Sequence, residues 1–367
     1  MGTSTVTAVE LTRADVLAFR VRAQQLDRTA GTLADTAVLD LGVQDTGADA
    51  GRWALAVRGV PDVDITQLVL LWTLRGAPHL YRRADLPGVA AATAPFSDAD
   101  AGKRIFDAAK PLKAAGIPNL TALDTVAGAM REVVTAPTVK GEMSRQLTAV
   151  VDPPYLRYCR PCAATHVYEQ PFRLAALRAG LELQPDTSPP VLQPVPGLTA
   201  AETVPPHLDV VRGYLRLHGP ATRQQVAGYL DAPVKDVTAH WPEDAVEVTV
   251  EGERRWVLAA DVDRLHAGPA RSTRLLGPFD PYLQTRDRAL LVPDGVRAKD
   301  LWRTLGRPGA VLVDGEVAGT WRPRKRGDQL TVLVEPWSDV PRAALEEQAA
   351  RLAAVRGSRL AGVEVSG

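Results

Sequence analysis

An amide, a carboxylate and a hydroxyl stand side by side in this sequence, at Gln44, Asp45 and Thr46. They follow the mainly apolar run "VLDLGV" and precede the turn residues Gly47 and Gly51. A glutamine amide can donate to and accept from a bound water, and so can hold it in one orientation. A carboxylate can take a proton from that water or stabilise a developing positive charge. The three residues are therefore the candidate catalytic group.

The spacing of these three side chains divides them between two faces. The run that starts at Val38 and the later run "WALAVR" are both predicted to be strands, and adjacent residues of a strand point to opposite faces. Gln44 and Thr46 then share a face, which Asp45 joins only through a β-bulge. The alternative is that Asp45 and Thr46 form an Asx-type turn that opens the loop to Trp53. The sequence leaves both interpretations open.

Basic residues gather in two sets. The first lies on the strand-like runs that flank Gln44, and the second lies in "QTRDR" and "TWRPRKRGD". The last stretch is the densest cationic segment and is predicted to form a hairpin turn, which suits contact with phosphates or with a groove of a nucleic acid. The alternative for any one arginine is a solvated face or a local ion pair. The candidate nucleic-acid contacts are Arg58, Arg75, His79, Arg82, Arg83, Arg286, Arg288, Arg322, Arg324, Lys325 and Arg326.

A possible metal-binding pattern occurs in "CRPCAATHVYE", which supplies Cys159, Cys162, His166 and Glu169. A structural zinc ion usually takes four ligands, and no second CxxC or histidine pair completes the set. The sequence therefore predicts two thiols without a metal, and no cofactor, with a zinc site as the alternative. It also contains no Gly-rich phosphate loop, HExxH motif or serine nucleophile elbow.

Composition sets broad limits on the class of protein. The 367 residues carry 43 Lys and Arg against 43 Asp and Glu, so any surface for a polyanion must come from uneven distribution of charge. Two cysteines cannot supply a disulfide framework, which fits a reducing compartment. The N-terminus lacks the pattern of a signal peptide, and no apolar run reaches the length of a membrane span. We expect a cytoplasmic protein without a membrane partner.

The clearest supersecondary pattern lies in residues 205–262. Three helices are predicted, in "PPHLDVVRGYLRLHG", from Thr222 onward and in "DAPVKDVTAHW", and two alternating strands follow in "AVEVTVEGERRWVLA". Gln225, three residues after Thr222, completes a capping box. Three helices and a β-hairpin are the layout of a winged helix, a helix-turn-helix variant with a β-wing.

Weaker patterns of the same kind occur earlier, and the chain becomes rich in strands after residue 270. Helices are predicted at 12–26, 98–115, 121–134, 139–151 and 340–355, and strands in "QLVLLWTLRGAPHLYRR", "RALLVP", "AVLVDGEVAGTW" and "LTVLVEPW". The sequence therefore predicts an α+β fold of tandem winged-helix modules with a β-rich C-terminal part. The expected domains are 1–95 with the candidate catalytic group, 96–185, a Pro-rich linker at 186–204, 205–265 and 266–367.

Several stretches together carry a resemblance to a known family. They are "AFRVRAQQL", "LGVQDT", "WTLRGAPHL", "HGPATRQQVAGYL", "LLGPFDPYLQTRDR" and "VLVDGEVAGTW", and they span almost the whole chain. With them the sequence resembles the bacterial winged-helix DNA glycosylases that unhook interstrand crosslinks, the azinomycin-resistance family. The resemblance implies three tandem winged helices in a C-shape, a monomer that binds double-stranded DNA, and hydrolysis of the N-glycosidic bond of bulky N7-alkylated purines.

The catalytic signature of that family is a glutamine, a hydrophobic residue, and then glutamine or aspartate. Gln44 matches the first position, whereas Asp45 and Thr46 depart from the second and third. Ala77 likewise stands in "RGAPH" where the family has a threonine. An alkylated purine already carries positive charge, so the reaction needs an oriented water and stabilisation of an oxocarbenium-like transition state. We expect Gln44 to position the water, with Asp45 or Thr46 assisting.

Two other functions fit the same residues. One is a catalytically inactive winged-helix module that binds damaged DNA or regulates. The other is a resistance protein that sequesters a small alkylating natural product. The departures at Asp45 and Thr46 are the features that separate catalysis from binding alone.

Overall fold

The computed structural model describes residues 10–366 and divides the chain into two compact units. The first unit contains Met1–Val63, Val211–Val226 and Trp241–Gly367, and the second contains Asp64–Val210 and Ala227–His240. Helices and several sheets occur together, which confirms the α+β class. The expectation about a signal peptide falls partly on residues 1–9, which lie outside the described part. Among the described residues no helix has the length and apolar character that a membrane crossing needs.

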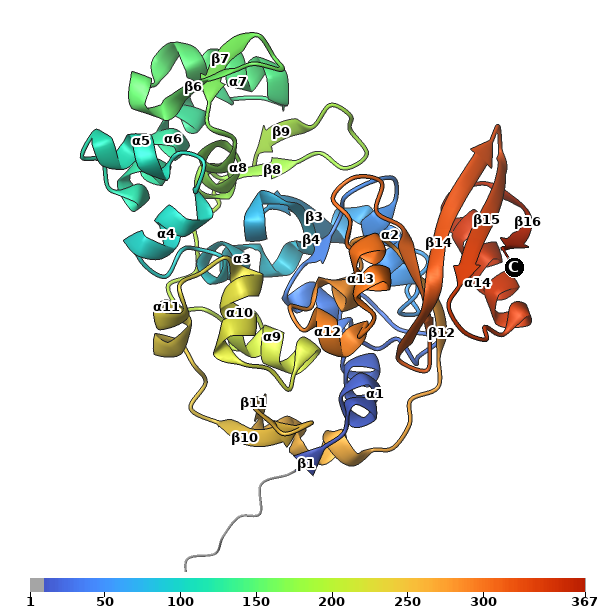
Figure 1. The fold of residues 1–367 in the computed structure, drawn as a ribbon. Coiled ribbons are helices and arrows are strands. Elements are labelled where there is room, and N and C mark those ends of the chain that lie inside the picture. The colour runs from blue at the N-terminus through green and yellow to red at the C-terminus, as the bar shows by residue number, and fades with distance from the viewer. Residues whose placement is uncertain (1–9, 367) are drawn as a thin grey trace, which may run out of the picture. The chain divides into compact units, whose positions relative to one another are not determined.

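Two sheets lie in the first unit. Strand β1 (Glu10–Leu11) runs parallel to β10 (Ala245–Val250), which pairs with β11 (Glu253–Leu258) in a hairpin. The second sheet has the order β12-β13-β14-β15-β16 and is antiparallel except for its last pair (Figure 1). Its strands are β12 (Thr273–Leu276), β13 (Gly309–Val313), β14 (Glu316–Arg326), β15 (Gln329–Pro336) and β16 (Arg359–Val365).

The strand-rich character of the C-terminal part is confirmed, with two differences. The run "RALLVP" forms the short helix α12 (Arg288–Leu291) and not a strand, and α13 (Gly295–Leu301) follows it. The closing helix α14 (Arg342–Val355) is not the last element, because β16 returns alongside β15 in parallel. A short apolar run cannot be assigned to helix or strand by periodicity alone, which accounts for the first error.

The second unit combines a run of paired strands with a helical layer (Figure 1). Strands β4, β3, β8, β9 and β5 are neighbours in that order, and β6 and β7 form a separate two-stranded sheet. The Pro-rich stretch predicted as a linker contains β9, which pairs with β8 and β5, so this part of it is strand. The strands are β3 (Leu68–Trp72), β4 (Pro78–Arg82), β5 (Thr138–Val139), β6 (Leu156–Cys159), β7 (Ala164–Val167), β8 (Leu181–Leu183) and β9 (Val191–Pro194).

The predicted helices 121–134 and 139–151 are present in the second unit and the predicted helix 98–115 is divided in two, whereas Leu86–Ala92 and Glu169–Arg178 are helices that were not predicted. Met130 and Phe172 are buried with Trp72 in one apolar core, which fixes the faces of α6 and α8. The helices are α3 (Leu86–Ala92), α4 (Asp98–Arg104), α5 (Ala109–Ala114), α6 (Asn119–Val133), α7 (Lys140–Val150), α8 (Glu169–Arg178) and α11 (Val234–Ala239).

The elements predicted for residues 205–262 are all present in the predicted order. They are α9 (Val210–His218), α10 (Arg223–Leu230), α11, β10 and β11. The capping box is confirmed, since Thr222 N donates to Gln225 Oε1 at 2.9 Å and Gln225 N donates to Thr222 Oγ1 at 3.2 Å.

The segment after the candidate catalytic group differs from its prediction. The run "WALAVR" belongs to a helix, α2 (Ala50–Ala56), whereas β2 is only Val43–Gln44. Alanine and leucine favour a helix, and burial of Trp53 fixes its face. Trp53 Nε1 donates to Leu275 O at 2.6 Å, which ties α2 to β12. The helix α1 (Arg13–Ala23) lies in the same apolar core.

Arg58, just beyond α2, forms a buried ion pair with Asp280. Its two terminal nitrogens donate to the two carboxylate oxygens at 2.9 and 2.8 Å, and the remaining donors reach Gln24 and Ala54 O. The Arg58 side chain is 0% exposed. The prediction that Arg58 contacts a nucleic acid is therefore wrong, because all five of its N–H groups bind within the core.

A second buried ion pair network lies in the same unit. Asp287 accepts from Arg20 NH2 at 2.8 Å and from Arg255, and Arg20 Nε donates to Gly219 O. Burial raises the pKa of Asp287, but the two guanidinium groups outweigh it and hold the pKa below its ordinary value. The network joins α1, β11 and the segment before α12.

Removal of one partner from the Arg58–Asp280 pair should strongly destabilise the protein. We expect Arg58→Ala or Asp280→Asn to lower the free energy of unfolding by about 3–5 kcal/mol, because each leaves an uncompensated buried group. Urea unfolding measures this change. The control is Arg359→Ala in the exposed pair with Asp328, which should cost less than about 1 kcal/mol. Equal effects of Arg58→Ala and Arg359→Ala would contradict the structural role.

Candidate active site

Gln44 and Thr46 lie on one face and contact each other. Gln44 Nε2 donates to Thr46 Oγ1 at 3.0 Å, and both side chains are partly exposed. Gln44 is the last residue of β2, and Gly47 follows Thr46 with φ +98°, which turns the chain toward α2. The hydrogen bond from Nε2 to Thr46 fixes the plane of the Gln44 amide, and the amide oxygen is the atom that can accept a hydrogen bond from a water. The pair is an amide carbonyl beside a hydroxyl, at the edge of the core.

Asp45 points elsewhere. Its Oδ1 accepts from Gly51 N at 2.8 Å, in the first turn of α2. A carboxylate suits this position because the first N–H groups of a helix have no partner within the helix. This contact is not the predicted Asx-type turn, which would use the backbone two residues on, but it gives the carboxylate a structural partner while Gln44 and Thr46 remain together.

An arginine that was not predicted from the sequence lies beside this loop. Arg356, directly after α14, donates from NH2 to Ala48 O at 3.5 Å. Burial is the main cause that lowers its pKa, and the nearby Asp49 carboxylate partly opposes this. Since 308 residues separate Arg356 from Ala48, no local pattern could have revealed the contact.

Three predicted arginines of the second unit have partners in that unit. Arg75, in the β3–β4 turn with φ +59°, lies over the ring of Tyr229 at 4.7 Å and donates to Tyr229 O at 2.8 Å. Arg82 pairs with Asp85 at 3.3 Å. Arg83 is exposed and pairs with Glu182 at 2.9 Å. Local ion pairs thus account for the positions of Arg82 and Arg83.

His79 is buried in β4, with 1% of its surface exposed. Its Nδ1 donates to Ala77 O at 2.9 Å, and the hydroxyl of Thr73, a residue that the sequence analysis did not single out, lies 3.2 Å away. Burial, with a smaller contribution from Arg75, lowers the pKa of His79 to about 3. The prediction of a nucleic-acid contact at His79 is therefore wrong, because the ring is neutral and inaccessible.

Arg286, Arg288 and Arg307 form a group of like charges in the first unit. Burial lowers the pKa of Arg288, and the charges of Arg286 and Arg307 lower it further. The pKa of Arg307 is lowered by burial and by Arg286. Within residues 10–366, neither Arg288 nor Arg307 has an ion pair, and their guanidinium groups lie over Trp302 and Phe279. The arrangement suits an anion, and Arg307 is a member that the sequence analysis missed.

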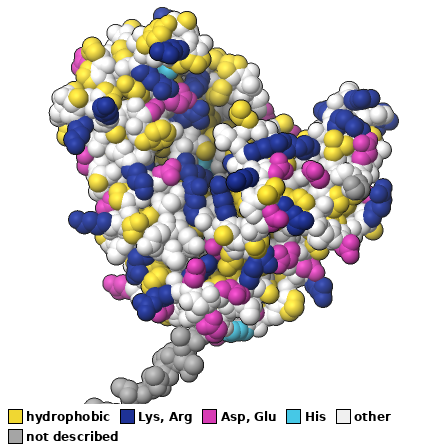
Figure 2. All heavy atoms as spheres, viewed as in Figure 1, with side chains coloured by type: hydrophobic (Ala, Val, Ile, Leu, Met, Phe, Trp, Pro, Cys, Tyr) yellow, Lys and Arg dark blue, Asp and Glu magenta, His cyan; other side chains and the backbone are white. Residues whose placement is uncertain are grey.

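The other predicted cations lie on the β14–β15 hairpin. The turn joins Arg326 to its partner Gln329, as predicted, and Figure 2 shows dark-blue side chains gathered at the free end of this hairpin. Arg322 donates to Gly306 O at 2.8 Å, and Arg324 pairs with Glu364. Lys325 and Arg326 are exposed, and neither forms an ion pair with any residue of the described range.

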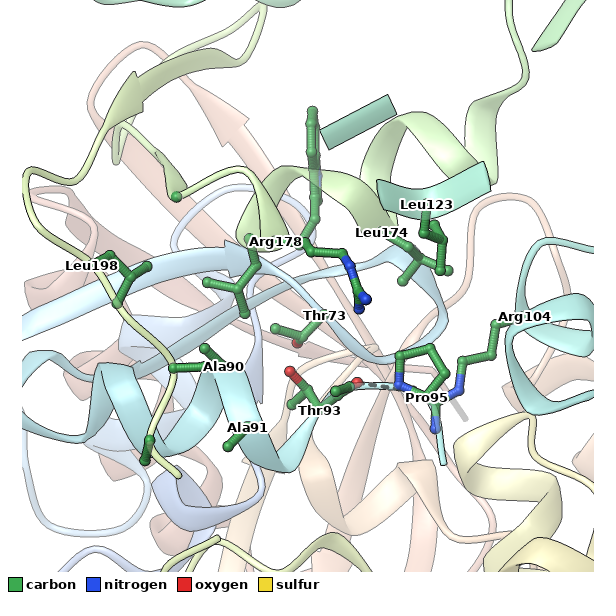
Figure 3. A pocket seen from close by; sticks show the side chains of 16 residues that line it. Thr73, Ala90, Ala91, Thr93, Pro95, Arg104, Leu123, Leu174, Arg178 and Leu198 are labelled. Carbon is green, nitrogen blue, oxygen red and sulfur yellow. Dashed lines mark hydrogen bonds between the residues drawn. The ribbon is translucent and has the colours of Figure 1, made fainter. Parts of the chain in front are cut away.

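A cavity of about 350 Å³ lies within the second unit. Its wall is mostly alanine and leucine, and Figure 3 shows Thr73, Thr93 and Arg178 among the side chains around it. The charges of Arg178 and Arg104 are balanced by Asp124 and Asp100. The cavity is thus an apolar space with few polar groups, and none of the candidate catalytic residues lines it.

The residues that could hold a metal are Cys159, Cys162 and His166. Their sulfur and nitrogen atoms lie within 4.8 Å of one another. A hydrogen bond with His166 is the main cause that lowers the pKa of the Cys159 thiol to about 7.

Comparison with known proteins defines the class and then the family. The family model described as "DNA glycosylase AlkZ-like" matches residues 38–355, which puts the protein among the DNA glycosylases, hydrolases that act on N-glycosyl bonds. The chain belongs to the AlkZ-like DNA glycosylase family. The family resemblance predicted from the sequence is confirmed. Among curated proteins, none matches the sequence.

A solved structure supports the same fold. The chain is similar to the DNA glycosylase AlkZ of Streptomyces sahachiroi, with a TM-score of 0.74 and 22% sequence identity. The match covers 98% of this chain and 100% of that chain. At this identity the likeness establishes the fold and not the residues that act.

The buried neutral His79 should make stability depend on pH. An unfolded histidine titrates near 6.5, whereas the folded pKa is about 3. Below pH about 6.5 only the unfolded state takes up the proton, so stability is lost as the pH falls, by up to about 1.4 kcal/mol per pH unit. Urea unfolding between pH 7 and 5 should show a shallower pH dependence for His79→Gln than for the unmodified protein. The exposed control His266→Gln should keep the original slope, and a steep slope in His79→Gln would refute the assignment.

Proposed function

We propose that the protein is a DNA glycosylase that hydrolyses the N-glycosidic bond of bulky N7-alkylated purines, or unhooks interstrand crosslinks, with Gln44 and Thr46 as the working pair. Membership of the AlkZ-like DNA glycosylase family supports the reaction class. The observation that carries the site assignment is the hydrogen bond of 3.0 Å from Gln44 Nε2 to Thr46 Oγ1.

The chemistry follows from the orientation of the amide. A water that donates one O–H to Gln44 Oε1 presents its lone pair to the sugar C1′, and the Thr46 hydroxyl fixes the amide. The water oxygen bonds to C1′ as the bond to the purine nitrogen breaks. The bonding electrons neutralise the positively charged base, and a proton from the water passes to solvent. No acid is needed for this leaving group.

We propose double-stranded DNA as the partner, bound by a cytoplasmic monomer. The basic surfaces proposed for it are the end of the β14–β15 hairpin and the group of Arg286, Arg288 and Arg307. Guanidinium groups that lie close together suit phosphates, because phosphate binding relieves their mutual repulsion. Arg75, Arg82 and Arg83 remain candidate contacts from the second unit.

We also propose the finer architecture expected from the sequence, three tandem winged helices. The order α9, α10, α11, β10 and β11 supports the module at residues 205–265. The other proposed divisions are 1–95, 96–185, 186–204 and 266–367.

A catalytically inactive binding module is the second candidate function. It is favoured by the contact of Asp45 with Gly51 N, since that contact leaves the carboxylate occupied in capping α2. Retained binding to damaged DNA, with no excision from N7-methylguanine DNA or from a crosslinked duplex, would decide for this alternative.

Sequestration of an alkylating natural product is the third candidate. The cavity of the second unit supports it, because about 350 Å³ is within the range of small-molecule sites. Binding of such a compound in the absence of DNA would decide for it.

Gln44→Ala should abolish most excision and leave DNA binding nearly intact. The contact to the water is made mainly in the transition state, so its loss lowers the rate by about 10²-fold or more while ground-state affinity is kept. Single-turnover excision of N7-methylguanine and equilibrium DNA binding measure the two effects. The matched control is Gln67→Ala, at an exposed glutamine that contacts Asp64. A rate close to that of the unmodified protein would exclude Gln44 from the reaction.

Two neighbouring variants separate the roles of Asp45 and Thr46. Asparagine keeps an oxygen for Gly51 N, so Asp45→Asn should retain excision to within a few-fold. Thr46→Val removes the acceptor for the Gln44 amide and should lower the rate substantially. Loss of excision in Asp45→Asn would instead assign the carboxylate to the chemistry, since its charge would then be required.

Replacement of Arg324, Lys325 and Arg326 by alanine should weaken binding to every duplex alike. Each lost phosphate contact should reduce the slope of log affinity against log salt by about one unit. Binding titrations over a range of salt concentrations measure this slope. The matched control replaces Lys110, Lys113 and Arg131, three exposed cations, and so removes the same charge. An unchanged slope in the hairpin variant would mean that its end does not touch DNA.

A further inference from the structure

The β6–β7 hairpin is a small sheet of its own. It pairs only these two strands, Leu156–Cys159 and Ala164–Val167, through four residue pairs. A two-stranded hairpin is marginally stable in water without support from another sheet or a helix. Cys162 and Thr165 are exposed on it, and Val167 is buried. The far end of the hairpin is therefore held by few apolar contacts.

The pairing places two possible ligands on one face. His166 is opposite Arg157, and Cys159 is two residues further along the same strand, so Cys159 and His166 share a face. The turn between the strands contains Cys162 and ends at Ala163, whose φ of +49° is left-handed. This turn brings Cys162 back toward Cys159, and the three ligand atoms lie within 4.8 Å of one another. Four tetrahedral ligands of zinc lie about 3.3–3.8 Å apart, so small side-chain rotations are sufficient.

The backbone contact of His166 favours the tautomer that leaves Nε2 for a metal. Its Nδ1 lies 2.8 Å from Val167 O, and a carbonyl oxygen can only accept, so Nδ1 carries the proton. In the neutral ring Nε2 is then the nitrogen with a lone pair, and a metal ion takes the place of the proton that the charged ring would donate to Cys159. Metal-binding histidines are typically oriented by this type of hydrogen bond from the other ring nitrogen to a carbonyl oxygen.

We propose that Cys159, Cys162 and His166 bind a zinc ion that crosslinks the two strands and the turn of the β6–β7 hairpin. Two thiolates and an imidazole are a ligand set that suits zinc, and the two negative charges balance the ion. Glu169 Oε1 accepts from Lys140 Nζ at 2.7 Å and from Arg173 Nε at 2.6 Å, so the carboxylate is held by two cations. We therefore assign the fourth position to water. The sequence favoured thiols without a metal because it supplied no fourth protein ligand.

Metal analysis of the full-length protein tests this proposal. Protein purified with a reductant and without chelators from zinc-supplemented cells should contain about one zinc per chain. Cys159→Ser and His166→Ala should lose this metal, whereas Arg160→Ala, in the same turn, should retain it. His266→Ala is the histidine control outside the hairpin. Zinc content that persists in Cys159→Ser/Cys162→Ser would overturn the assignment, and so would substoichiometric zinc in the unmodified protein after reconstitution.

A Co²⁺ titration of the unmodified protein tests the site even if a variant fails to fold. Metal-free unmodified protein titrated with Co²⁺ should develop the near-ultraviolet thiolate-to-cobalt charge-transfer absorption and the visible bands of tetrahedral cobalt, both of which Zn²⁺ should remove. Binding should also release protons, because thiols must deprotonate to ligate. Absence of the charge-transfer band, or a Cys159–Cys162 disulfide in place of free thiols under reductant, would refute the site.

Discussion

The buried ion pair of Arg58 with Asp280 is the interaction on which the rest of the first unit depends. It joins residues 222 positions apart, and its other hydrogen bonds reach the end of α1 through Gln24 and the last turns of α2 through Ala54. An unpaired Arg58 or Asp280 charge at this buried position would be strongly unfavourable, so the position of α2 depends on its contact with the segment after β12. Because the Asp45 carboxylate accepts from Gly51 N in the first turn of α2, the loop that carries Gln44, Asp45 and Thr46 also depends on the C-terminal part of the chain.

Features governed by local physics could be predicted from the sequence. The capping box at Thr222 needs only two side chains three residues apart, and the β14–β15 hairpin follows from two alternating runs around a glycine. The shared face of Gln44 and Thr46 also rests on local geometry. In each case the relevant contacts lie within a few residues, so no distant part of the chain had to be known.

Features governed by distant contacts could not be predicted. The run that contains Trp53 suits a strand or a helix, and its contact with Leu275 favoured one of them. Arginine is usually found on the surface, and only the ion pair with Asp280 accounts for the burial of Arg58. Arg307 and Arg356 are single arginines in unremarkable sequence, and the fold alone brings them to a cationic group and to the candidate catalytic loop.

The group of Arg286, Arg288 and Arg307 has a consequence for the lifetime of the protein. Half-buried like charges make the folded state less favourable than it would be with an anion between them. A polyanion that binds only the folded chain raises its free energy of unfolding, and the increase grows with the logarithm of the free polyanion concentration relative to the dissociation constant. A copy bound to a nucleic acid through this group therefore unfolds less readily, and is less readily cleaved by proteases that need an unfolded chain, than a free copy.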